Sequence, residues 1–167
     1  MDAAAADRGP ELLGRLGLRE REDALGEVRT LVDRLAPGYD FTREVELTES
    51  LALGDTVLLR DGGRVIGLAL CHTAPLVEGR TREELRVLKL ALADDSAIDA
   101  MLHALCDFAK RSGTRRVALR VQGEYPSLYR TMVTAGARVR WTDLRMALGG
   151  YEERKAGGGV VLSNWEI

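Results

Sequence analysis

The sequence predicts an α/β (α+β) domain with a mixed, mostly antiparallel central sheet and helices on both faces. Two apolar runs, 56–60 and 65–71, flank Asp61-Gly62-Gly63, a tight-turn signal that is typical of a β-hairpin. Beyond residue 85, strand-like runs alternate with helix-like runs. A hairpin followed by such an alternation favours a mixed sheet, because strands that are linked through helices can run parallel.

Two helices are predicted ahead of the hairpin. Apolar residues recur at helical spacing over 22–35, and Pro37-Gly38 ends that helix. A second helical stretch covers 42–52. Residues 1–18 lack a clear pattern and are interrupted by glycines and a proline. We therefore expect a flexible N-terminal tail or linker over 1–18 and a single domain over 19–167.

The middle of the chain predicts a strand that turns into a capped helix. A loop is expected over 74–83, and a strand over 85–92 follows it. Asp94-Asp95-Ser96 then supplies oxygens that can accept hydrogen bonds from the first amides of a helix over 97–111. Gly113 ends this helix.

Three further strands and one helix are predicted in the C-terminal part. The helix, 125–135, has Pro126 in its first turn and stops at Gly136. A polar, glycine-rich connection precedes the last strand. The three strands cover 117–121, 139–148 and 160–165.

Composition and charge exclude several classes of protein. The chain has 167 residues, of which 46% are hydrophobic, and its net charge of −2 without a basic stripe argues against a nucleic-acid partner. No apolar run approaches the ~20 residues of a membrane helix, and no signal peptide is visible, so we expect no membrane partner and a cytoplasmic location. Cys71 and Cys106 have no metal-ligand spacing and are expected to be small buried hydrophobes in a reducing compartment.

Three segments together resemble the GCN5-related N-acetyltransferase (GNAT) superfamily. They are the hairpin 61–67, the strand-turn-helix 88–102 and the helix-glycine-strand 128–137. The match covers about residues 19–167, and it is most like the second half of bacterial tandem acetyltransferases. The resemblance implies an acyl-CoA N-acyltransferase-like fold with acetyl-CoA as the co-substrate.

The resemblance also implies where acetyl-CoA would bind. Its pyrophosphate would lie at the start of the 97–111 helix, against the backbone amides of Ser96, Ala97 and Ile98, because unpaired amides and the helix dipole attract an anion. Its pantetheine arm would pair with the splayed edge of the preceding strand, beside Leu90 and Leu92.

The same turn departs from the family pattern. Ala97 and Asp99 stand where family members have glycines, and Asp94 and Asp95 bring negative charge to a site for an anion. Two interpretations stay open. Either the amides of the turn still bind acetyl-CoA, or the aspartates only cap the helix.

Three residues are candidates for acid–base chemistry. Family enzymes often carry a tyrosine four residues before the helix-ending glycine as a proton donor; here that position is Met132, and Tyr129 lies one turn earlier. The alternative for Tyr129 is a packed core residue. Glu84 and His72 are candidate general bases, with a solvated loop residue and a structural histidine as their alternatives.

The sequence therefore leads to one function and one alternative. The first is transfer of an acetyl group from acetyl-CoA to an amine of a small molecule or peptide. The alternative is a catalytically inactive domain of the same fold that serves as a ligand-binding, regulatory or dimerisation module, with a homodimer as the expected assembly. An unrelated α/β protein is the third and weakest interpretation.

Overall fold

The computed structural model describes residues 10–75, 83–144, 146, 148–150 and 158–163. In chain order the elements are β1 (Glu11–Leu12), a 3-10 helix (Leu13–Arg15), α1 (Leu18–Leu35), α2 (Thr42–Ser50), β2 (Gly54–Asp61), β3 (Arg64–His72), β4 (Glu84–Leu92), a 3-10 helix (Asp95–Ala97), α3 (Ile98–Arg111), β5 (Arg116–Leu119), α4 (Pro126–Thr134) and β6 (Val160–Ser163).

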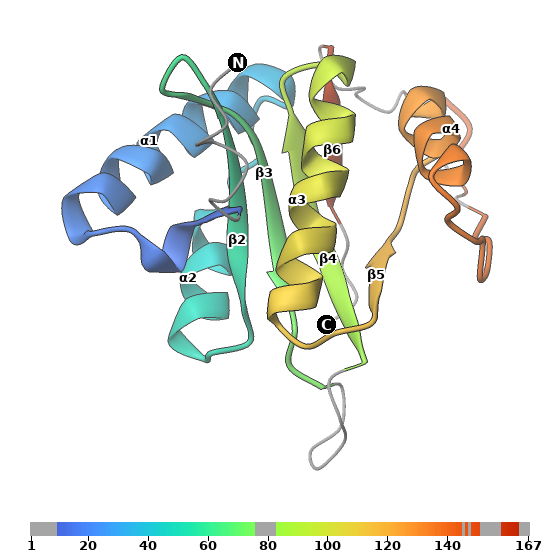
Figure 1. Cartoon of the computed structure of the whole chain (residues 1–167). Coiled ribbons are helices and arrows are strands. Elements are labelled where there is room, and N and C mark those ends of the chain that lie inside the picture. Colours follow the sequence, from blue (N-terminus) through green and yellow to red (C-terminus); the bar gives the residue numbers. More distant parts are fainter. Residues whose placement is uncertain (1–9, 76–82, 145, 147, 151–157, 164–167) are drawn as a thin grey trace.

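The strands form one mixed sheet (Figure 1). Its order is β1-β2-β3-β4-β5, and β6 pairs with β4 off this path. Only the β4–β5 pair is parallel among the pairs of described strands; the others are antiparallel. The predicted mixed, mostly antiparallel sheet is thus confirmed.

Helices cover both faces of the sheet, as predicted. In Figure 1 α3 crosses the front of the sheet, while α1 and α2 lie on its other side. Alternate residues of β3 enter the two layers: Leu68 and Leu70 pack with the residues of α1, and Ala69 and Cys71 pack with those of α3. This alternation follows from the two-residue period of a strand.

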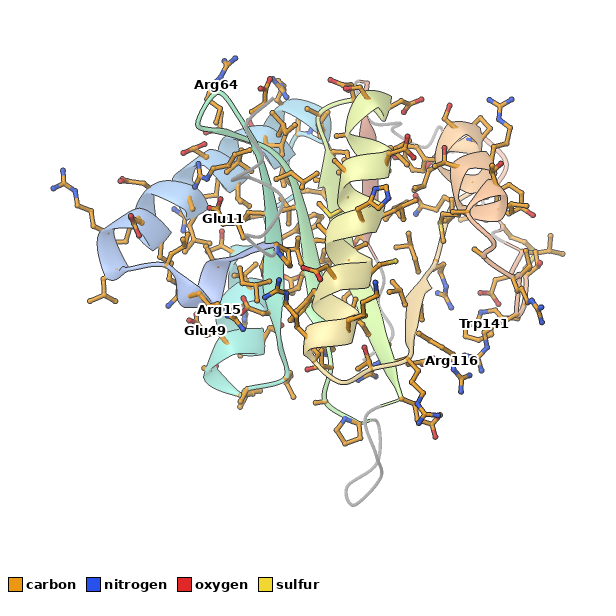
Figure 2. All side chains as sticks on the ribbon, viewed as in Figure 1. Glu11, Arg15, Glu49, Arg64, Arg116 and Trp141 are labelled. Carbon is orange, nitrogen blue, oxygen red and sulfur yellow. The ribbon has the colours of Figure 1, made fainter. Side chains whose placement is uncertain are left out.

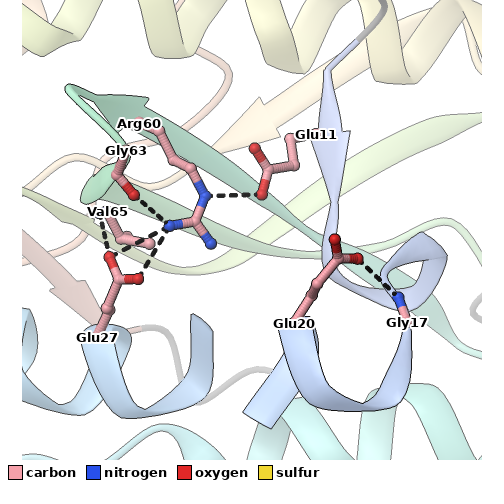
Figure 3. Close-up of polar contacts among 7 residues, drawn as sticks. All are labelled: Glu11, Gly17, Glu20, Glu27, Arg60, Gly63 and Val65. Atoms are coloured by element: carbon pink, nitrogen blue, oxygen red, sulfur yellow. Dashed lines mark hydrogen bonds and ion pairs between the residues drawn. The ribbon is translucent and has the colours of Figure 1, made fainter. Parts of the chain in front are cut away.

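A polar cluster around Arg60 ties the first elements together (Figure 3). The Arg60 guanidinium donates from Nε to the Glu11 carboxylate at 2.9 Å and from Nη1 to the Gly63 carbonyl at 2.7 Å. Nη1 also donates to Glu27 at 3.0 Å, and Glu27 accepts from the Val65 amide at 2.6 Å. The cluster therefore joins β1, α1 and the β2–β3 hairpin.

The expected N-terminal tail over 1–18 is wrong for the part that the structure describes. Residues 11–12 form the edge strand β1, which pairs with β2, and α1 begins at Leu18. Leu12 and Leu13 are buried, and the Gly14 amide donates to Asp55 at 2.9 Å. Two residues of strand and one turn of 3-10 helix are too short to produce a periodic pattern, so they could not be predicted from apolar spacing. Residues 1–9 lie outside the described residues.

The expected strand over 139–148 is also wrong. None of the residues described in this range is in a strand, and Val139, Trp141 and Leu144 are exposed. Figure 2 shows Trp141 at the outer rim of the molecule, on the side of β5. The alternating pattern is typical of a strand, but a strand also needs an edge to pair with. Among the described strands, β6 pairs with β4 at the edge beyond β5. The predicted end of that last strand, 164–165, lies outside the described residues.

Candidate functional site

The candidate site is the place where the parallel strands β4 and β5 separate. Their pairing runs from Glu84–Arg116 to Val87–Leu119, and β5 ends there while β4 continues to Leu92. The two strands run parallel, and they separate after Val87 and Leu119. The helix start expected after β4 is present, and β5 leaves the end of the β4 edge to another partner.

The C-terminal strand β6 occupies the edge of β4 beyond this point. It runs antiparallel to β4, in a register that pairs Lys89 with Ser163 and Leu92 with Val160. Leu90 and Leu92, which were expected to line a pantetheine arm, are both buried in the core on the α3 side. The opening between β4 and β5 is therefore filled by the protein's own chain.

Glycine makes the close entry of β6 possible. Gly159 has φ +69°, and a Cβ on it would collide with the Leu92 carbonyl oxygen and lie 2.7 Å from that of Ala93. Any side chain at 159 would be excluded both by this contact and by the left-handed backbone. The adjacent Gly158 also has a positive φ, +92°, but a Cβ there would meet no atom within 4 Å.

A single tyrosine holds the other side of β6. The Tyr125 hydroxyl donates to the Val161 carbonyl at 3.0 Å and accepts from the Val161 amide at 3.2 Å. Burial raises the pKa of this hydroxyl above its ordinary value of 10.0. Tyr125 immediately precedes α4, so the start of this helix is anchored to the C-terminal strand.

Lys89 connects the end of β6 to α2 through its ammonium group. Its ammonium donates to the Ser163 hydroxyl at 2.8 Å and lies 3.5 Å from the Glu44 carboxylate. It also lies 5.4 Å from the centre of the Phe41 ring. The residue is only 4% exposed, so these contacts compensate a charge that would otherwise be costly to bury.

The start of α3 is capped by the protein's own oxygens. The Asp94 carboxylate accepts from the Ser96 amide at 2.8 Å and from the Ser96 hydroxyl. The Ala97 amide donates to the Asp94 carbonyl and the Ile98 amide to that of Asp95, which leaves the three amides engaged. These hydrogen bonds lower the pKa of the Asp94 carboxyl, so the negative charge stays at the helix start near neutral pH.

In this conformation the described residues do not fit acetyl-CoA. The pantetheine edge of β4 is paired with β6, and the amides expected for the pyrophosphate are engaged beside a carboxylate. Ala97 and Ile98 are buried in the core, and of the three expected pyrophosphate residues only Ser96 is exposed. The cap interpretation of Asp94 is thus confirmed for this conformation.

The three acid–base candidates lie in different surroundings. Tyr129 is 48% exposed on α4, so its alternative as a packed core residue is wrong. His72 is buried at the end of β3, where its Nε2 is 2.9 Å from the Thr48 hydroxyl oxygen; burial, together with the nearby Arg86, lowers its pKa. Glu84 accepts from Arg140 at 3.0 Å.

The structure does not place the two candidate bases at the helix start. Glu84 and Leu92 are the two ends of β4, separated by eight residue steps of about 3.3 Å, or about 26 Å. His72 pairs opposite Arg86, near the Glu84 end of the strand. Their roles as general bases, and that of Tyr129 as the proton donor, stay predictions.

Three other expectations concern the cysteines, metal ligands and membrane-spanning helices. Cys71 is buried, as expected, but Cys106 is exposed, because it lies on the outer side of α3. No group of three or more His, Cys, Asp or Glu residues suited to a metal ion is present in the described part of the chain. Among the described helices, none has the length and apolar character needed to cross a bilayer.

Solved acetyltransferases share the fold of this chain. One is an acetyltransferase from Trypanosoma brucei, with 17% identity, a TM-score of 0.56 and coverage of 76% of this chain and 94% of that one. Another is the aminoglycoside N-acetyltransferase AAC(6')-Iy in complex with CoA, with 13% identity, a TM-score of 0.57 and coverage of 80% and 95%.

A third is the ribosomal-protein-alanine N-acetyltransferase from Brucella melitensis biovar Abortus, with 14% identity, a TM-score of 0.54 and coverage of 80% and 96%. No protein-family model and no curated protein matches the chain. At these identities the likeness shows the fold, and the chain has the predicted GNAT fold.

Proposed function

We propose that this chain is a GNAT-type N-acetyltransferase that acts on an amine of a small molecule or peptide. Its C-terminal strand β6 holds the enzyme in a closed form. The observation that carries the proposal is the separation of β4 from β5 after Val87 and Leu119, with β6 lying in the opening. An enzyme of this fold needs that opening for its acetyl donor, and the opening is retained here, although it is filled.

The fold neighbours support the acetyl-transfer half of the proposal. AAC(6')-Iy has been solved with CoA and with a bisubstrate analogue that joins CoA to acetylneamine, and the Brucella neighbour is named for an alanine of a ribosomal protein. Amines of both kinds are therefore acceptors for proteins with this architecture. The acceptor class of this chain is proposed by that analogy.

A second candidate function is a non-catalytic module of the same fold. It is favoured by the turn before α3, where Asp94 caps the Ser96 amide and Ala97 and Asp99 replace the glycines of the family pattern. A module of this kind would bind a regulator or pair with a second copy. The homodimer expected from the sequence stays a prediction that light scattering on the purified protein can check.

A titration of the intact protein with acetyl-CoA tests the closed form. Because a ligand that binds only the folded state stabilises it by mass action, the melting temperature reports binding. We expect no rise in melting temperature up to millimolar acetyl-CoA. A rise that saturates at micromolar concentrations would contradict the closed form, because it would mean that acetyl-CoA reaches its site without an appreciable cost of opening.

A further inference from the structure

We propose that β6 is a releasable latch, held by the Tyr125 hydroxyl, and that its departure frees the β4 edge for an extended, amide-bearing ligand. The proposal rests on the proposed function, since the ligand it names is the pantetheine arm of acetyl-CoA. It concerns how that site is opened.

The first argument is that β6 has a strand partner on one edge only. It pairs with β4 through four residue pairs, from Lys89–Ser163 to Leu92–Val160, and no other described strand pairs with it. β5, which continues the sheet beside β4, ends at Leu119. On the free side of β6, both backbone polar groups of Val161 are bonded to one side-chain oxygen, that of Tyr125.

The second argument is that the path into the edge depends on one residue. Gly159 passes so close to the carbonyl oxygens of Leu92 and Ala93 that a Cβ would displace the chain. A side chain at this position would therefore shift the equilibrium from β6 paired with β4 toward β6 released. The neighbouring Gly158, with a similar φ and open space around it, has no such constraint.

The third argument concerns what would replace β6. Val160, Val161 and Leu162 are all buried, so a free β6 exposes apolar side chains and leaves the β4 edge unpaired. Release is therefore unfavourable without a ligand that restores hydrogen bonds along the edge. Pantetheine is an extended chain with amide groups, and it can make strand-like hydrogen bonds to the freed backbone.

The latch links the fraction of molecules with β6 released to the apparent dissociation constant of acetyl-CoA. If acetyl-CoA binds only the open form, its apparent dissociation constant equals the intrinsic one divided by the open fraction. A substitution that weakens the latch should therefore raise the open fraction and tighten acetyl-CoA by the same factor. Tyr125→Phe keeps the ring and removes the hydroxyl, and with it both hydrogen bonds to Val161. We expect a factor of about five or more from their loss.

The experiment measures both quantities on the full chain. Hydrogen exchange followed by mass spectrometry gives the protection of 160–163 and of 89–92, and the melting temperature gives acetyl-CoA binding. For hydrogen exchange, Tyr125→Phe is compared with Tyr129→Phe, which removes a tyrosine hydroxyl from an exposed position one turn along α4. Gly159→Ala places a methyl group against the backbone where β6 enters the edge, and Gly158→Ala is its control. Both substitutions put alanine at a positive φ, but only the one at 159 meets nearby atoms.

We expect faster exchange of 160–163 and 89–92 in Tyr125→Phe and Gly159→Ala, together with a rise in melting temperature at millimolar acetyl-CoA that the native protein does not show. Exchange should keep the native rate in Tyr129→Phe and Gly158→Ala. Unchanged exchange in both variants would overturn the latch and leave the closed form of the proposed function standing. Faster exchange without any acetyl-CoA binding would keep the latch as a moving strand but overturn its ligand, and it would favour the non-catalytic module. Should one variant fail to fold, the other still decides between these results.

Discussion

The Glu27 carboxylate in α1 and the Val65 amide at the start of β3 are joined by a hydrogen bond of 2.6 Å (Figure 3). The same carboxylate receives the Arg60 guanidinium at 3.0 Å. Glu27 thus bonds the first helix to both strands of the hairpin. This relationship helps to position the α1 layer on the sheet, alongside the buried apolar residues that α1 and β3 share.

Replacing Glu27 with glutamine should lower the free energy of unfolding by about 1–2 kcal/mol, because charge-assisted hydrogen bonds to the Val65 amide and to Arg60 are weakened. The side chain is 35% exposed, and solvent screening keeps the effect below that of a buried pair. Urea denaturation measures the change. The matched control is Glu22→Gln on an exposed position of the same helix, which should change the free energy by less than about 0.5 kcal/mol.

The same carboxylate should also make stability depend on pH. The Val65 amide, and to a smaller extent Arg60, lower the pKa of Glu27 below its ordinary value of 4.5. A folded pKa below the unfolded one means that the stabilisation is complete above about pH 4.5 and is lost as the pH falls through the folded value. The urea midpoint of the native protein should therefore drop more steeply below pH 4.5 than that of Glu27→Gln. Parallel curves for the two proteins would contradict this.

His72 should contribute a second, separate pH dependence. Burial, followed by the repulsion of Arg86, lowers its pKa from the ordinary 6.5, so the folded protein keeps the imidazole neutral beside Thr48. Unfolding restores the ordinary pKa and takes up a proton, so this stabilisation is complete above about pH 6.5 and declines as the pH falls through the folded value. Urea midpoints between pH 7.5 and 5 should show a decline that His72→Gln removes. If the decline persists in His72→Gln, other titrating groups cause it.

The sequence predicted the central elements because their signals are local. Apolar periodicity located the two helices on the α1 face, Asp61-Gly62-Gly63 located the hairpin turn, and Asp94 was expected to cap the next helix. The placement of β6 could not be predicted in this way. Which edge a strand pairs with is decided by contacts far along the chain, such as that between Tyr125 and Val161, and no local pattern encodes them.

The candidate site was predicted only in outline for the same reason. The strand end and helix start near Ser96 are local features, and they are present. The residues that close the site, Tyr125, Lys89 and Gly159, carry no motif. The run Gly157-Gly158-Gly159 was visible in the sequence as a glycine-rich connection, but only the close approach to Leu92 explains why glycine is needed at its end.

The two cysteines should differ sharply in reactivity. Cys106 is exposed on α3, whereas Cys71 is fully buried in β3, where burial raises the pKa of its thiol. An aromatic disulfide reagent should therefore modify one thiol in the folded protein and two after unfolding in urea. Cys106→Ser should abolish the reaction of the folded protein, and rapid modification that persists in this variant would show that β3 opens in the native state.

The charge at the start of α3 should oppose ligand binding even after the latch is released. The Asp94 carboxylate takes the Ser96 amide and places a negative charge where a pyrophosphate would approach. In a Tyr125→Phe background, Asp94→Ala should tighten acetyl-CoA by a further factor of about three to ten, because the amide is freed and the repulsion is removed.

The matched control is Asp23→Ala on an exposed position of α1, which changes net charge equally and should leave the affinity unchanged. The gain from Asp94→Ala should also shrink as salt is raised, because mobile ions screen the interaction between exposed charges. Weaker binding in Asp94→Ala would mean that the ligand needs the capped turn, and the amides of Ser96 to Ile98 would then no longer be the candidate pyrophosphate site.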